Sequence, residues 1–331
     1  MKQQPLQPTA FPKVDPGMDR LLEILGAGNP APPQEPSPKA IAHMREAASQ
    51  VRRTWADSVP VGRPRRHIVE TSNGPVPLTI HLPDGVPGGT ILFLHGGGWT
   101  LFDSETHSPL MRALAMKTGW AVVGVDYPRA PETPYPGPIE ACATVIRTVM
   151  RTGPRLGLPE PLALCGDSSG ANLAVAATLL MRDIDEILPA ALVLFYGVYD
   201  CDLSRQSYAK FGSEAFPLSA EKMAWFWDRY CPDVSRRDEP LASPLQADLA
   251  GLPPTNMVVA GQDILRDENL AMATRLAEAG VRVSLDVYPG AVHAFCEAVG
   301  FVDVSRRAVG RSAAWLVDTT GASVGPRGSA A

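Results

Sequence analysis

The chain has 331 residues, of which 45% are hydrophobic, and this length and composition suit one large buried core or two modest ones. It carries 30 lysines and arginines against 35 aspartates and glutamates, so its formal net charge is -5. This balance provides no sustained positive field for a phosphate backbone, which argues against nucleic acid as a partner.

The cysteines and the N-terminal residues indicate the cellular setting. The five cysteines form no CxxC pair and have no histidine partners at zinc-ligand spacing, so we expect reduced thiols and no metal site. The opening stretch "MKQQPLQPTAFPKVDPG" lacks the apolar run of a signal sequence, and no segment approaches the roughly 20 apolar residues of a membrane span. These patterns predict a cytoplasmic protein without a membrane partner.

Residues 1–60 predict two helices in a proline-rich setting. Asp15 can cap a helix that ends at Gly26, and Ser37 can cap a second helix that begins near Pro38. Because both helices are amphipathic and lie outside the strand pattern that follows, we expect them to pack on the rest of the protein. Their apolar faces hold Met18, Leu21, Leu22 and Leu25 in the first helix and Ile41, Met44, Ala48, Val51 and Trp55 in the second.

From about Arg66 the pattern changes to strands. "HIVETSNGPVPLTIHL" predicts a hairpin around an Asn73-Gly74 turn, and short apolar runs then alternate with helical patterns. Strands that are buried on both faces and separated by helices are typical of a parallel sheet, so we predict an α/β fold with a mostly parallel central sheet. The predicted strands are 90–95, 120–127, 162–166, 191–198, 255–261 and 282–290, and the predicted helices are 138–151, 169–182 and 267–279.

A long insertion, about 200–240, separates two of these strands. Ser219 can cap a helix here, and Met223, Phe226, Trp227 and Tyr230 fall on one face of it. Packing against the body of the protein is the first interpretation of this stripe, and lining a substrate pocket is the second. At the other end, residues 318–331 lack periodicity and predict a disordered tail.

The stretch "LALCGDSSGANLA" suggests a nucleophilic serine. Ser168 stands in a G-x-S-x-G motif between a buried strand and a helix, which is the strand-turn-helix setting of a nucleophile elbow. Gly166 and Gly170 leave room for the sharp turn, and the helix start places a partial positive charge beneath the serine.

A serine nucleophile needs a base and an acid that orients the base. His293 follows the last predicted strand, where it would reach the same sheet edge as Ser168, and Asp263 follows the strand before it. Asp267 and Glu268 are rivals for the acid, although both also suit the first turn of the next helix. The histidines at 43, 67, 81 and 107 carry no signal of a role.

Three consecutive glycines follow another buried strand in "FLHGGGWT". Such a run lets backbone N–H groups point into a site, so we predict an oxyanion hole formed by the amides of Gly97 and Gly98 together with that of Ser169, the residue after the nucleophile.

Together these motifs resemble the hormone-sensitive lipase group of α/β-hydrolase esterases, which includes bacterial acetyl esterases and arylacetamide deacetylase. The likeness covers about 200 residues, from "HGGGW" through "DYPRAPE" and "GDSSGANLA" to "YPGAVHAF". It implies an α/β-hydrolase core over 61–317, with 1–60 and 200–240 as a helical cap, and a triad of Ser168, Asp263 and His293. The sequence departs from the usual family motifs at Pro128, Ser169, Ile264 and Ala294.

The resemblance implies a serine hydrolase that cleaves small-molecule esters of short acyl chains without a cofactor. An amidase or deacetylase that removes an acetyl group from a secondary metabolite is an alternative, because the same triad serves both reactions. A silent small-molecule receptor is a further alternative, although His293 is retained. The expected substrate-binding residues are Trp99, Trp225, Phe226 and Phe295. The sequence leaves the oligomeric state open, with a homodimer as one option.

Overall fold

The structure, a computed structural model, describes residue 15 and residues 17–28, 32–33, 37–55, 58–59 and 63–321. Within these residues the chain forms an eight-stranded sheet with the order β1-β2-β4-β3-β5-β6-β7-β8. β2 pairs antiparallel with β1 and β4, and the remaining neighbours are parallel. The strands are β1 (Arg65–Thr71), β2 (Gly74–His81), β3 (Thr90–Leu94), β4 (Ala121–Val125), β5 (Leu162–Asp167), β6 (Leu192–Phe195), β7 (Thr255–Gln262) and β8 (Val283–Val292). The predicted hairpin and mostly parallel sheet are confirmed.

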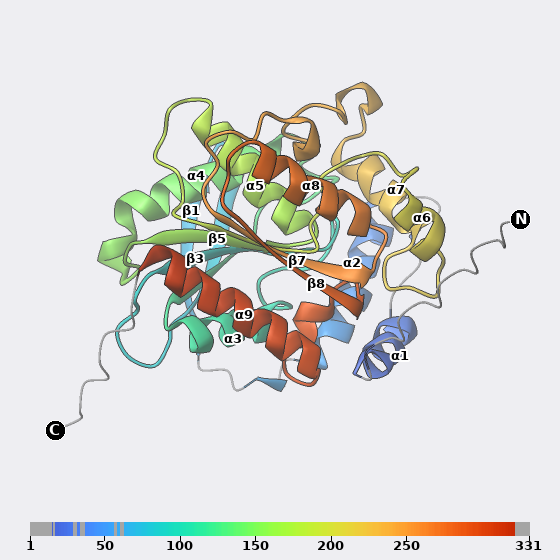
Figure 1. Ribbon diagram of the computed structural model, residues 1–331, viewed down its shortest axis with the longest axis horizontal. Helices are drawn as coiled ribbons and strands as arrows, with labels where there is room; N and C mark the ends of the chain where they lie inside the picture. The colour runs from blue at the N-terminus through green and yellow to red at the C-terminus, as the bar shows by residue number, and fades with distance from the viewer. Residues whose placement is uncertain are drawn as a thin grey trace, which may run out of the picture.

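The strands at the centre of the sheet are buried on both faces. Every residue of β3, β4, β5 and β6 is buried, because their Leu, Val, Ile and Phe side chains supply apolar surface to both sides. Helices α4 (Gly137–Thr152), α5 (Ser169–Arg182) and α8 (Arg266–Glu278) cover one face, and α3 (Ser108–Thr118) and α9 (Asp303–Thr320) cover the other (Figure 1). Each face therefore has its own hydrophobic cluster.

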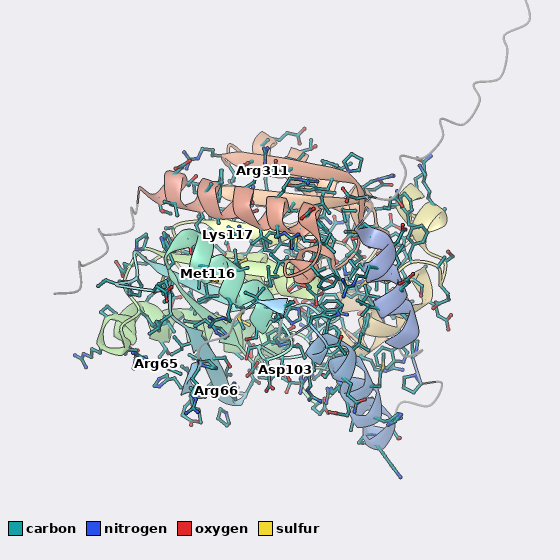
Figure 2. The ribbon with its side chains drawn as sticks, turned by 90° about the horizontal axis from the view of Figure 1, so that it is seen from below. Arg65, Arg66, Asp103, Met116, Lys117 and Arg311 are labelled. Carbon is teal, nitrogen blue, oxygen red and sulfur yellow. The ribbon has the colours of Figure 1, made fainter. Side chains whose placement is uncertain are left out.

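Two helices that cover the sheet, α3 and α9, lie outside the elements expected from the sequence. They pack side by side, with Lys117 on α3 and Arg311 on α9 (Figure 2). α9 also corrects the predicted tail, because residues 318–320 are helical and the helix is closed by Gly321 with φ 67°. The rest of that predicted tail, 322–331, lies outside the described residues.

Four helices gather beyond the ends of β7 and β8: α1 (Met18–Gly28), α2 (Pro38–Arg53), α6 (Gln206–Phe211) and α7 (Ala220–Tyr230) (Figure 1). Both serine caps expected from the sequence are present. Ser37 Oγ accepts a hydrogen bond from Ala40 N at 3.2 Å, and Ser219 Oγ accepts one from Lys222 N at 3.2 Å. None of the described helices is both long enough and apolar enough to cross a membrane.

Candidate active site

Ser168 occupies a sharp turn between β5 and α5. Its φ of 51° and ψ of -121° lie in a region that side-chain-bearing residues rarely adopt. Added Cβ atoms show why the flanking glycines are needed: one at Gly166 would lie 2.5 Å from the Gly170 backbone, and one at Gly170 would lie 1.9 Å from Leu94 O. The turn is fixed by Ser168 N, which donates to Phe195 O at 2.9 Å. The local structure is the elbow that the motif predicts.

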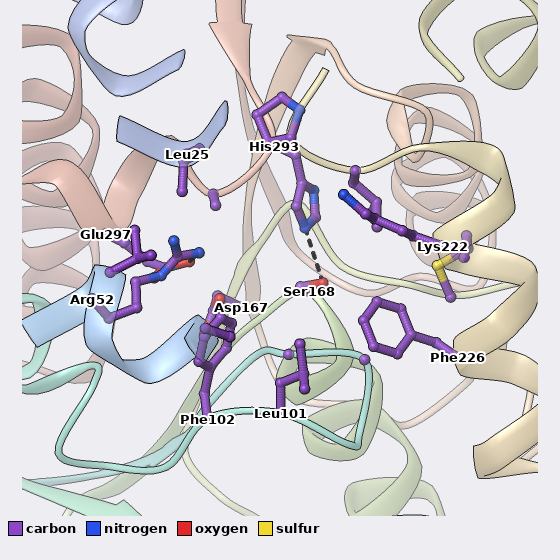
Figure 3. Close-up of a pocket in the computed structure, with 18 of the residues that line it drawn as sticks. Leu25, Arg52, Leu101, Phe102, Asp167, Ser168, Lys222, Phe226, His293 and Glu297 are labelled. Carbon is purple, nitrogen blue, oxygen red and sulfur yellow. Dashed lines mark hydrogen bonds and ion pairs between the residues drawn. The ribbon is translucent and has the colours of Figure 1, made fainter. Parts of the chain in front are cut away.

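The structure brings Ser168, His293 and Asp263 together from the ends of β5, β8 and β7. His293 Nε2 lies 3.1 Å from Ser168 Oγ (Figure 3). On the other side of the ring, His293 Nδ1 lies 2.7 Å from Asp263 Oδ2. Asp263 Oδ1 also accepts from Leu265 N at 3.1 Å, which fixes the carboxylate. This is a continuous hydrogen-bonded chain from a carboxylate through an imidazole to a hydroxyl.

The two rival acids are held elsewhere. Asp267 accepts from Ser207 N at 2.8 Å and pairs with Arg266 at 2.7 Å. Glu268 is fully buried and accepts from Tyr199 N at 2.7 Å. Both side chains therefore support the start of α8 and the adjoining loop, while Asp263 is the acid bonded to the imidazole.

The surroundings of His293 favour a basic imidazole. Burial acts to lower the pKa of His293, but the carboxylate of Asp263, with smaller contributions from Asp167 and Glu297, outweighs burial and raises the pKa above its ordinary 6.5. An imidazole with a raised pKa is a stronger proton acceptor for a hydroxyl within hydrogen-bond distance.

The glycine loop after β3 folds back over Ser168. Gly97 and Gly98 have φ values of 112° and 58°, and a Cβ on Gly98 would lie 2.2 Å from the Phe226 ring, so a side chain does not fit there. Both glycines line the same cavity as Ser168, and Ser169 opens α5 directly after it. The residues predicted to supply oxyanion donors therefore lie around the hydroxyl.

A cavity that opens to solvent lies over Ser168. The helices near the N-terminus and the 200–240 insertion provide most of its roof, and Phe226, one of the expected substrate-binding residues, is part of the wall (Figure 3). The lining is mainly apolar, which suits a small organic molecule. The roof and wall residues from these segments are Leu25, Met44, Ala48, Val51, Arg52, Pro217, Leu218, Lys222, Met223 and Phe226.

The other three predicted substrate-binding residues are absent from the described lining of this cavity, which corrects the sequence prediction. Trp99, with φ 55°, is fully buried and stacks on Tyr230 at 4.0 Å between ring centroids. Trp225 is 8% exposed, with the Arg229 guanidinium 4.9 Å from its ring centroid. Phe295 is fully buried in the cluster beneath α3 and α9. All three serve core packing, and the stripe on α7 divides between core and cavity.

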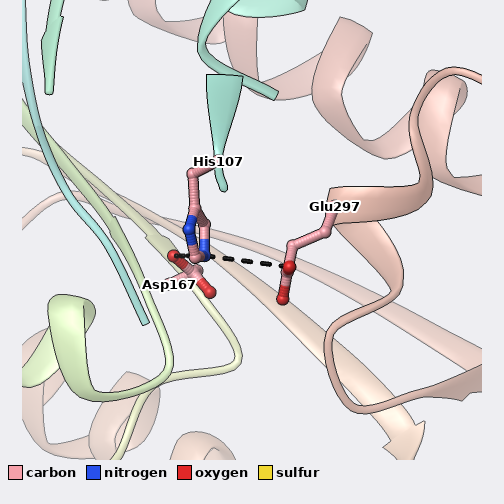
Figure 4. Close-up of side chains that lie close together, drawn as sticks. All are labelled: His107, Asp167 and Glu297. Atoms are coloured by element: carbon pink, nitrogen blue, oxygen red, sulfur yellow. Dashed lines mark ion pairs between the residues drawn. The ribbon is translucent and has the colours of Figure 1, made fainter. Parts of the chain in front are cut away.

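A buried group of charged side chains, which the sequence gave no reason to expect, adjoins the cavity. Arg52 Nε lies 2.6 Å from Glu297 Oε2. His107 Nε2 lies 3.5 Å from Asp167 Oδ1 and 3.8 Å from Glu297 Oε2 (Figure 4). Asp167 Oδ1 also accepts from Gly96 N at 2.8 Å. The group joins α2, the loop before α3, the elbow and the segment after His293.

The charges in this group balance one another. Burial acts to lower the pKa of His107, but the carboxylates of Asp167 and Glu297 outweigh burial and raise it to about 9. His107, Asp167 and Glu297 offer atom types that bind metal ions. However, protonated His107 and Arg52 already supply two positive charges to the two carboxylates. We interpret the group as paired ions that hold four segments together.

His107 should make stability depend on pH. Because its folded pKa of about 9 exceeds the ordinary 6.5, its contribution is fully present below pH 6.5 and is lost as pH rises through 9. The shift corresponds to roughly 3 kcal/mol of unfolding free energy. Urea unfolding of the wild type at about pH 6 and about pH 10 should record this loss, and His107→Gln should have a weaker pH dependence. An equal loss of unfolding free energy in both proteins between these pH values would contradict the assignment of the pH dependence to His107.

Comparison with known proteins agrees with the fold. Residues 91–297 match a family model for the α/β hydrolase fold. The chain is 33% identical over 250 residues to carboxylesterase NlhH of Mycobacterium tuberculosis, covering 73% of this chain and 77% of the relative. It is 29% identical over 283 residues to an acetyl esterase of Salmonella paratyphi B, covering 84% and 87%.

Solved structures give the same result. An α/β hydrolase enzyme from the metagenome of Lake Arreo has a TM-score of 0.85 and 30% identity, and a hyperthermophilic esterase of Pyrobaculum calidifontis has 0.84 and 29%; each match covers 93% of this chain and 99% of the other. Fold and matches together define an α/β-hydrolase of the serine hydrolase class. The chain belongs to the hormone-sensitive lipase family and is a carboxylic-ester hydrolase.

Proposed function

We propose that the protein hydrolyses esters of short acyl chains through an acyl-enzyme formed on Ser168. The observation that carries the proposal is the chain of hydrogen bonds from Asp263 through His293 to Ser168 at the floor of the cavity. An ethyl acetate hydrolase of Pseudomonas putida and an acetyl-hydrolase of Streptomyces hygroscopicus, each 32% identical to this chain, carry names that support a small acyl group.

The proposed mechanism has two halves. In the first, Ser168 Oγ attacks the ester carbonyl carbon while His293 Nε2 takes the hydroxyl proton, and Asp263 stabilises the imidazolium. The amides of Gly97, Gly98 and Ser169 would then stabilise the tetrahedral oxyanion. Its collapse breaks the ester C–O bond, and His293 gives its proton to the leaving alcohol.

In the second half, His293 takes a proton from a water molecule, which attacks the acyl-enzyme carbonyl. The second tetrahedral intermediate collapses, Ser168 recovers its proton from His293, and the carboxylic acid leaves. The hydrogen bond between His293 and Ser168 counts against the receptor hypothesis, and the ester-hydrolase names of the relatives count against an amidase.

A series of p-nitrophenyl esters tests this proposal. We expect kcat/KM to be highest for acetate or butyrate and at least about tenfold lower for palmitate, because the N-terminal helices and the 200–240 insertion roof the cavity and leave little room for a long acyl chain. The matched p-nitroanilide should be cleaved more slowly than the ester. Faster cleavage of the anilide, or equal rates with palmitate and butyrate, would contradict the proposal.

A further inference from the structure

The cavity wall contains a buried lysine that the proposed mechanism does not use. Lys222 lies on α7, one residue before Met223, and its side chain is 6% exposed. Figure 3 shows its amine reaching from α7 into the cavity, on the same side as His293 and across from Arg52. A positive charge therefore faces a mainly apolar space above Ser168.

The other charges that line the cavity compensate one another. Arg52 holds Glu297 through two contacts, Nε to Oε2 at 2.6 Å and Nη2 to Oε1 at 3.3 Å. Asp167 is bonded to Gly96 N and lies beside His107. This opposite wall is close to neutral, so it offers no strong attraction for an ionic substrate.

Lys222 has a weaker partner. Its Nζ lies 3.5 Å from Glu214 Oε2, and the Glu214 side chain is 63% exposed. Glu214 lines a second pocket beside α1, which adjoins the cavity and shares Lys222 with it. This is the one ion pair of Lys222 with a described residue. Such a long contact with a solvated carboxylate is screened by water and contributes little attraction.

A buried ammonium is unfavourable unless an anion or several hydrogen bonds compensate it. A neutral substrate that fills the cavity would displace water from the Lys222 amine without bringing a negative charge to compensate it. A carboxylate would replace that water with a charge-assisted hydrogen bond, for which a lysine amine is a compact, mobile donor.

We propose that Lys222 binds a carboxylate carried by the substrate, so that the preferred esters are acidic molecules. This inference rests on the proposed ester hydrolysis at Ser168 and names the substrate class for that site. Two sources of the carboxylate fit: a half-ester of a short dicarboxylic acid, with the charge on the acyl part, and an acetylated hydroxy acid, with the charge on the alcohol part.

Matched substrate pairs test the proposal and separate the two sources. For a charged acyl part, monoethyl adipate is compared with ethyl hexanoate. For a charged alcohol part, 4-acetoxybutyrate is compared with butyl acetate. Release of acid is followed by titration at constant pH. We expect the wild type to prefer the acidic member of at least one pair. We expect Lys222→Met to lower that ratio of kcat/KM values by about 10- to 100-fold, as for other charged hydrogen bonds.

Three further variants make the result specific. Lys222→Arg should retain most of the preference. Glu214→Gln should retain it or increase it, because the competing carboxylate is removed. Lys117→Met, which removes an exposed lysine on α3, should leave the ratio unchanged.

An unchanged ratio in Lys222→Met, or an equal loss in Glu214→Gln, would overturn the inference and make the lysine a structural element of the cap. Preference of the wild type for the neutral member of both pairs would also overturn it. These results leave ester hydrolysis itself intact. A wild type that cleaves none of the four esters and no p-nitrophenyl ester would instead remove the proposed function.

Discussion

Replacing Ser168 with alanine is expected to lower kcat for p-nitrophenyl butyrate by about a millionfold. His293 Nε2 would then have lost the hydroxyl that lies 3.1 Å away, and no acyl-enzyme could form. The fold should persist, because alanine occupies less space and meets the same backbone strain at φ 51°. The measurement is single-turnover hydrolysis with enzyme in excess over substrate.

Ser204→Ala is the matched control for this variant, because Ser204 is an exposed serine whose loss should leave the rate unchanged. Both proteins should unfold at similar urea concentrations. If Ser168→Ala retained more than about one hundredth of the wild-type rate, a different nucleophile or a water attack would be needed.

The second large effect is expected for Asp263→Asn, which should reduce kcat by about 10⁴-fold. Asp263 fixes the His293 tautomer through the 2.7 Å contact with Nδ1, and an amide can present its N–H there instead. Asp263 is also the main group that raises the pKa of His293 above 6.5 against the effect of burial.

The pH profile should identify this role. The base must be neutral to accept a proton, so wild-type kcat/KM should rise with pH through an apparent pKa above 6.5 and level off at alkaline pH. In Asp263→Asn the plateau of kcat/KM should be lower, and the rise of kcat/KM should occur at lower pH. Asp267→Asn, which alters a carboxylate beside Ser207, should change neither. A similar loss in both variants would contradict the assignment.

The positions of Ser168, His293 and Asp263 could be predicted because each depends on a local pattern. Ser168 and the glycine loop are marked by backbone requirements that only glycine meets, and these leave a signature in the sequence. His293 and Asp263 could be chosen because the carboxyl ends of parallel strands meet at one edge of the sheet. In this part of the fold, order along the chain determines position in space.

The direction of aromatic side chains was less predictable. Trp99 and Phe295 each adjoin a motif residue, but the chain turns sharply at these points, with φ of 55° at Trp99 and 66° at Ala294. The turns carry both rings into the core, where Trp99 stacks on Tyr230. Nearness to a motif in the sequence therefore does not show whether a side chain at a tight turn points into the cavity or into the core.

The group of Arg52, His107, Asp167 and Glu297 could not be derived from sequence either, because its members come from four separate segments. α3 escaped prediction for a related reason: its residues are buried on most sides, so the polar half of an amphipathic pattern is missing. α9 combines arginines, small residues and Gly310, which also weakens the pattern.

The most direct test of the nucleophile is reaction with a fluorophosphonate, followed by mapping of the labelled peptide by mass spectrometry. We predict that one phosphonyl group per chain forms on Ser168 and that esterase activity is lost completely. Neither Ser168→Ala nor the denatured wild type should be labelled. Labelling of another residue in step with inactivation, or full inactivation without modification of Ser168, would contradict the account.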